Sequence, residues 1–108
     1  MIITLFKARP RQGIDQADYE STFQRMVELA SQMPGFIDIE GFGAADGAEL
    51  AVVRFESEET LLAWKNHPEH VATQQRGRDE FFESYHITVA ERVREYEFPD
   101  PRSGADDG

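Results

Sequence analysis

The sequence contains no cysteine among its 108 residues. This absence excludes disulfides, thiolate catalysis and cysteine-based metal sites, and it is compatible with the cytoplasmic location that we predict. No apolar run approaches the ~20 residues that a membrane-spanning helix requires. The apolar start of the chain precedes its first basic residues, which is not the order found in a secretory signal peptide. We therefore expect no membrane association.

Basic residues are also scarce, with 11 Lys and Arg against 21 Asp and Glu and a formal net charge of −10. Such a surface repels the phosphates of nucleic acids, so we expect no nucleic-acid partner, although acidity can equally serve only to keep a small domain soluble. The chain has no glycine-rich phosphate loop and no Ser-His-Asp order. Its three histidines do not form a set with the spacing of metal ligands, and we predict no metal site.

The patterns that are present predict one domain of alternating strands and helices. Residues 2–9 read as a strand, Asp15 caps a long amphipathic helix, and Asp46-Gly47 turns a hairpin between strands at 36–43 and 49–55. Ser57 caps a short helix, a further helix begins near Pro68, and residues 85–98 read as a last strand. The order β-α-β-β-α-β indicates an α+β, ferredoxin-like split βαβ fold with an antiparallel sheet. We assign residues 1–98 to this domain and expect residues 99–108 to be a disordered acidic tail.

Two features of the strands predict a homodimer. The first strand is apolar on both of its faces, so the side of the sheet without helices needs a cover. The last strand, at 14 residues, outruns the usual length of ~5–6. Two copies that pack their sheets together would account for both features.

The stretch from Trp64 to Phe82 holds the candidate functional residues. Pro68 fits the first helical position, with His67 as the capping residue and Asn66 as the alternative. The side chains of His70, Gln74 and Arg78 then follow at i, i+4 and i+8 along one helical face. This polar row beside an aromatic cluster can line a pocket, or it can be the solvated edge of an amphipathic helix.

Several motifs together resemble one known family. They are PGF at 34–36, the DG hairpin, SEET-LLAW at 57–64, N-x-x-x-H at 66–70, Q-x-x-x-R at 74–78 and F-x-x-Y at 82–85. The chain resembles the antibiotic-biosynthesis-monooxygenase (ABM) domain family of the dimeric α+β barrel superfamily over roughly residues 1–98. The resemblance implies a dimeric α+β barrel and, for function, a cofactor-independent oxygenase.

At two sets of positions this chain lacks the functional residues of characterised members of the family. Its haem-degrading members place an axial histidine ten residues after the tryptophan, where this chain has Gln74, and an asparagine near the end of the first strand, where it has Phe6-Lys7-Ala8. Its anthrone-oxidising members use an asparagine and a tryptophan on the strand that matches residues 49–55, and neither is present here. We therefore expect no haem and no other cofactor.

The resemblance implies oxidation of a small aromatic phenol or hydroquinone. We expect His70 to be the general base, since its ordinary pKa of ~6.5 lies near the working pH, and Arg78 to hold the phenolate. The alternatives are a histidine on a solvated face beside Glu69 or Gln74, and an arginine paired with Asp79 or Glu83. The residues predicted to contact the substrate are Trp64, Asn66, Gln74, Phe82 and Tyr85, although Trp64 can also be a core residue. The competing function is a non-catalytic domain, stress-related or binding a small molecule.

Overall fold

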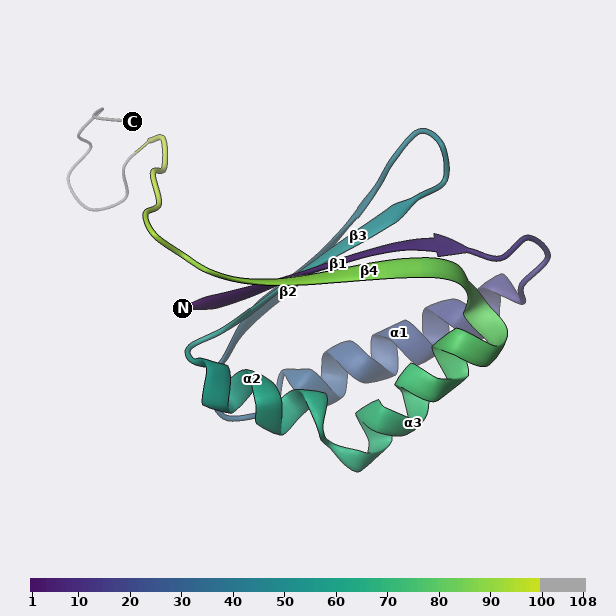
Figure 1. Cartoon of the computed structure of the whole chain (residues 1–108), viewed down its shortest axis with the longest axis horizontal. Helices are drawn as coiled ribbons and strands as arrows, with labels where there is room; N and C mark the ends of the chain where they lie inside the picture. The colour runs from purple at the N-terminus through teal and green to yellow at the C-terminus, as the bar shows by residue number, and fades with distance from the viewer. Residues whose placement is uncertain (100–108) are drawn as a thin grey trace.

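The computed structural model describes residues 1–99 and confirms the ferredoxin-like α+β fold. Its elements are β1 (Ile2–Pro10), α1 (Gln16–Ala30), β2 (Phe36–Gly43), β3 (Glu49–Phe55), α2 (Glu58–Lys65), α3 (Pro68–Arg76), the π-helical turn η1 (Gly77–Phe81) and β4 (Phe82–Glu91). The four strands form one antiparallel sheet in the order β2-β3-β1-β4. The helices cover one face of this sheet, and within residues 1–99 nothing covers its other face (Figure 1).

The predicted helix starts are confirmed by their capping contacts. The Asp15 carboxylate accepts from the backbone N–H of Asp18, and Ser57 forms a capping box with Thr60. His67 caps α3, because its Nδ1 accepts from the backbone N–H of Glu69 at 3.1 Å. These caps fix where α1, α2 and α3 begin.

The core lies between α1, α2 and one end of the sheet. Its buried residues are Met26, Leu29, Ala30, Phe55, Leu61 and Trp64, and Ile2 and Val53 pack against them. Ile2 and Val53 share the helix-facing side of the sheet with Thr4 and Phe6, because side chains two apart on a strand, or paired across strands, point to the same side. The intervening residues, including Ile3 and Leu5, face the open side, so β1 carries apolar side chains on both faces as predicted.

The last strand differs from its prediction at both ends. β4 begins at Phe82 and ends at Glu91, not at residue 98. Glu91 pairs with Ile2 at the start of β1, so beyond Arg92, whose N–H donates to the Met1 carbonyl, β1 offers nothing to pair with. The alternation of apolar and polar residues continues beyond Arg92, but the hydrogen-bonded pairing of β4 with β1 ends there.

Smaller differences concern bulges and exposed side chains. The pairing of β2 with β3 is irregular between Phe36 and Asp38, at the start of β2. Leu62 and Val71, two apolar residues of the helices, are 42% and 46% exposed. The tail from residue 100 lies outside the described residues. Within residues 1–99 no helix has the length and apolar character that crossing a bilayer requires.

Candidate functional site

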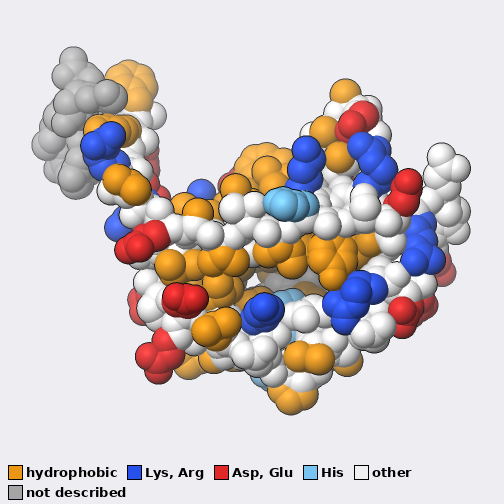
Figure 2. Space-filling view, viewed as in Figure 1, with side chains coloured by type: hydrophobic (Ala, Val, Ile, Leu, Met, Phe, Trp, Pro, Cys, Tyr) orange, Lys and Arg blue, Asp and Glu red, His pale blue; other side chains and the backbone are white. Residues whose placement is uncertain are grey.

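A groove separates the outer strand of the sheet from the helical layer. Tyr85, Ile87 and Val89 of β4 pair with Ala8, Phe6 and Thr4, so all three face the helices. They nevertheless remain 37%, 48% and 52% exposed, which shows that the helices do not close over this part of the sheet. Figure 2 shows the surface hollowed between β4 and the helices, with apolar side chains along the rim and a histidine at the floor. We call this hollow the β4 groove.

His70 and Trp64 form a stacked pair in the helical layer. Their ring centroids lie 3.9 Å apart with an interplanar angle of 12°. Trp64 is only 6% exposed and belongs to the core, and the imidazole covers one of its ring faces. Trp64 therefore supports His70 rather than offering its own surface to a ligand.

The protonation of His70 follows from its partners. Nδ1 lies 3.1 Å from the carbonyl oxygen of Trp64, which can only accept, so Nδ1 carries the proton and Nε2 keeps a free lone pair. Burial lowers the pKa of His70, since it disfavours the charged form, and this outweighs the opposing effect of the bond to the Trp64 carbonyl. The side chain is thus a neutral imidazole with one nitrogen available as a base.

Arg78 and Tyr85 form the second polar pair. Nη1 of Arg78 donates to the Tyr85 hydroxyl at 3.2 Å, and Nη2 donates to the Gln75 side-chain carbonyl at 2.8 Å. Neither Asp79 nor Glu83 pairs with it, and the guanidinium has no carboxylate partner within residues 1–99. Its positive charge is available to an anionic ligand.

The other predicted site residues fall around these two pairs. Gln74 neighbours His70, with its amide Nε2 3.4 Å from Nδ1, but this amide donates to the carbonyl of Lys65 at 3.0 Å and not to the protonated Nδ1. Phe82 packs edge-to-face on Phe6, with centroids 5.3 Å apart. Asn66 is the C-cap of α2, and its exposed side chain makes no hydrogen bond within the described chain. The structure thus brings His70, Gln74 and Trp64 together, and Arg78, Tyr85 and Phe82 together, but leaves Asn66 apart.

The group around His70 and the group around Arg78 lie at different points along the continuous helical segment formed by α3 and η1. His70 and Arg78 are eight residues apart, which at 1.5 Å per residue is about 12 Å along the axis. η1 begins at Gly77, and a π-turn has a wider hydrogen-bonding ring than the α-helix, so Arg78 leaves the row predicted from 3.6-residue spacing. It reaches Gln75 and Tyr85 instead of Gln74. A ligand that touches both His70 and Arg78 must be elongated.

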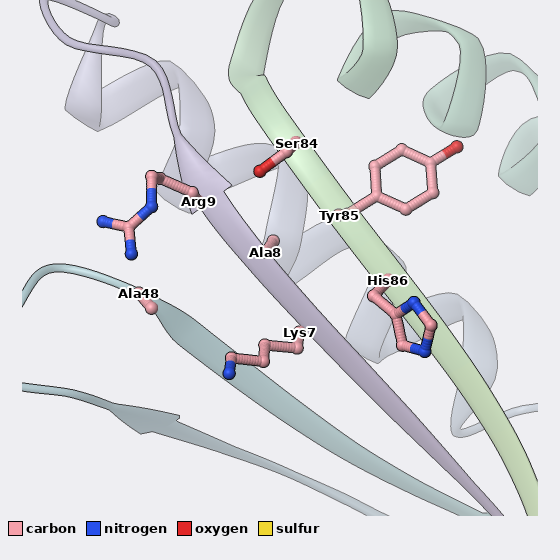
Figure 3. Close-up of a pocket in the computed structure, with 7 residues that line it drawn as sticks. All are labelled: Lys7, Ala8, Arg9, Ala48, Ser84, Tyr85 and His86. Carbon is pink, nitrogen blue, oxygen red and sulfur yellow. The ribbon is translucent and has the colours of Figure 1, made fainter.

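A second hollow lies at the sheet itself, and strand pairing, not a sequence motif, brings its lining residues together. It has a volume of about 380 Å³ and is lined by Lys7, Ala8, Arg9, Ala48, Ser84, Tyr85 and His86. Figure 3 shows the Tyr85 ring directed away from Lys7 and Arg9, toward the helices. Strand register alone brings Lys7 beside His86, and Arg9 is partly neutralised by Asp46 at 3.0 Å. Within residues 1–99 no three His, Asp or Glu side chains converge as metal ligands.

Comparison with known proteins identifies the family of this chain. Protein YqjZ of Bacillus subtilis, itself uncharacterised, is 38% identical over 77 residues, which are 71% of this chain and 68% of that protein. Rv0793 from Mycobacterium tuberculosis has a similar fold, with a TM-score of 0.77 at 15% identity over 89% of this chain and 98% of its own. A variant of SnoaB, a cofactor-independent oxygenase from Streptomyces nogalater, gives a TM-score of 0.75 at 13% identity over 92% of this chain and 97% of its own. The family model of antibiotic biosynthesis monooxygenase matches residues 1–76, and the chain therefore belongs to this family.

Proposed function

We propose that this protein is a cofactor-independent monooxygenase that oxidises an aromatic phenol or hydroquinone in the β4 groove. The observation that carries the proposal is the neutral, half-buried His70, fixed by Trp64 on one side and holding Nε2 free. A general base must be in its neutral form to accept a proton, and the lowered pKa of His70 keeps the imidazole neutral at neutral pH. Membership of the family and a fold shared with SnoaB support the same class of reaction.

The reaction needs no more than a base, an anion holder and oxygen. Nε2 of His70 takes the acidic proton of the phenol, or of its keto tautomer, and leaves an electron-rich anion. This anion transfers one electron to O₂, and the resulting radicals combine into a C–O bond as a hydroperoxide that recovers the proton from His70. Loss of water then leaves a carbonyl, so one oxygen atom stays in the product and the other departs as water.

The apolar groove supports each of these steps. The guanidinium of Arg78 is exposed at the end of the groove and has no carboxylate partner within residues 1–99, so it is free to hold negative charge at the far end of the ligand. Ile87 and Val89 supply apolar contact for a flat ring, and their exposure leaves room for it. The hydroxyl of Tyr85, held by Arg78, is placed to donate to the same ligand atom.

The test is oxygen uptake with 1,4-dihydroxynaphthalene and anthrone in the presence of EDTA. Replacing a positioned base typically costs 10²–10⁴-fold, so we expect His70→Ala to lower turnover by about that factor. Arg78→Lys should also slow the reaction, because an ammonium cannot reproduce the planar fork of the guanidinium. His86→Ala is the matched control, since His86 faces the open side of the sheet and its loss should leave the rate unchanged.

Equal rates for wild type, His70→Ala and Arg78→Ala across the panel would reject the proposal. Binding of these aromatics without turnover would then favour a small-molecule-binding domain, the alternative function. The proposal places the protein in the cytoplasm, which the lack of cysteine fits. It also includes a homodimer, argued below from the open face of the sheet.

A further inference from the structure

Thr4 holds a hydroxyl that its own fold does not use. Oγ1 is buried and has no hydrogen-bond partner within residues 1–99, and no other buried side-chain nitrogen or oxygen in that range shares this condition. Its neighbours across the sheet are Val53 on β3 and Val89 on β4, both apolar. A buried hydroxyl without a partner disfavours folding, so its presence among valines requires an explanation.

The position of Thr4 places it beneath the β4 groove. On the helix-facing side of β1, Ile2 packs against the core that holds Trp64, and Phe6 packs against Phe82 and Tyr85. Thr4 lies on the same side of the strand, midway between these two residues. It is therefore between the Trp64–His70 pair and the Arg78–Tyr85 pair, and beside Val89 on the groove wall.

Valine would serve the fold equally well at this position. It has the shape of threonine, it suits a strand at least as well, and it would remove the unpartnered oxygen. Core packing therefore explains the branched shape of residue 4 but not its hydroxyl. A site whose other contacts are a base at one end, a cation at the other and apolar walls between them does explain it.

We propose that Thr4 is a specificity-determining residue of the β4 groove, whose hydroxyl bonds an oxygen atom in the middle of the bound aromatic. Thr4 as a whole is only partly buried although its Oγ1 is occluded, so rotation about χ1 to another staggered position would exchange the accessible and occluded branches of the side chain and bring Oγ1 to the ligand. A hydroxyl both donates and accepts, so it recognises either the phenol before oxidation or the carbonyl after it. This inference rests on the proposed function for the location of the site, but it does not depend on turnover.

The test compares ligands with and without an oxygen atom. Equilibrium dialysis of the full chain with 2-naphthol and with naphthalene gives the preference for the oxygenated ring. We expect wild type to prefer 2-naphthol, and Thr4→Val to reduce that preference about 3- to 10-fold, the range of a neutral hydrogen bond, with naphthalene binding unchanged. Thr4→Ser keeps the hydroxyl and should keep the preference. Urea unfolding of Thr4→Val should give a midpoint no lower than that of wild type.

Each contrary result has a separate meaning. If wild type shows no preference for 2-naphthol, or if Thr4→Val retains the preference, the hydroxyl does not read the ligand and the inference is wrong. If Thr4→Val unfolds more easily and binds both aromatics more weakly, the hydroxyl is structural and the inference is again wrong. If the preference depends on Thr4 but wild type consumes no oxygen, only the proposed catalysis fails.

Discussion

At the scale of single residues, the lowered pKa of His70 makes the stability of the fold depend on pH. Its pKa is lowered in the folded protein, so between its unfolded value, ~6.5, and the lower folded value only the unfolded chain takes up the proton. The folded state therefore loses stability as the pH falls through this window and keeps the full contribution of His70 above it.

This dependence gives a prediction for the pH profile of unfolding. We expect the free energy of unfolding of wild type to fall more steeply below pH 6.5 than that of His70→Asn, by up to about 1.4 kcal/mol for each pH unit within the window. Urea titrations at pH 7.5, 6.5 and 5.5 measure the difference, and carboxylate protonation cancels because both proteins share it. Identical slopes for the two proteins would show that His70 is not perturbed by burial.

The contacts of His70 also show what the sequence could predict at this scale. Its proximity to Gln74 follows from helical spacing, because residues four apart share a face. The stack on Trp64 does not follow, since the two residues belong to different helices and meet only because His67 and Pro68 redirect the chain between them. The lack of a hydrogen-bond partner for the Thr4 hydroxyl could not be predicted from the sequence either, because it depends on which residues of β3, β4 and the helices surround it.

At the scale of elements, Gly77 permits the join between α3 and β4. It adopts ordinary right-handed helical angles, φ −58° and ψ −46°, so no unusual conformation requires glycine here. A Cβ at this position would instead lie 2.9 and 3.0 Å from two ring carbons of Phe82. That ring is packed against Phe6 and Tyr19 and cannot move away freely. Glycine is therefore required at position 77 by the close approach of an aromatic side chain.

We predict that Gly77→Ala destabilises the protein although alanine is the better helix former by ~1 kcal/mol. Overpacking a filled site typically costs 1–3 kcal/mol, and we expect a net loss of about 1 kcal/mol in urea unfolding. The same substitution should cost less in a Phe82→Leu background, which removes the ring that it meets. A gain in stability in the wild-type background would mean that the ring yields and propensity dominates.

The elements themselves were largely predictable, and the exceptions have physical causes. The helix starts and the hairpin turn at Gly47, where φ is +91°, were predictable because each is determined by residues next to it in the sequence. The end of β4 is not local, because it is set by the first residue of β1, far away in the sequence. The exposure of Leu62 and Val71 likewise does not follow from helical spacing, which does not show how each helix packs.

At the scale of the whole molecule, the described part of the chain leaves one face of the sheet and one extended segment uncovered. The open face has an apolar centre in which Leu5 is 36% exposed and pairs with Val52. Beyond β4 the chain runs away from the body (Figure 1), and Val93, Tyr96 and Phe98 are 85%, 66% and 80% exposed. A second copy that presents the same surfaces can cover both, and a two-fold axis would make the contacts reciprocal.

We therefore predict a homodimer, with a mass by light scattering of about twice the 12.3 kDa of one chain at micromolar concentration. Leu5→Glu should shift the mass to that of a monomer, because it buries a charge in the interface while pointing away from the helices and the core. Val89→Glu is the matched control: it is also exposed on a strand but faces the helices, and it should stay dimeric. A monomeric wild type would leave the open face without this explanation. A dimer that survives Leu5→Glu would place the interface elsewhere, and the exposed segment after β4 would then be the first surface to test.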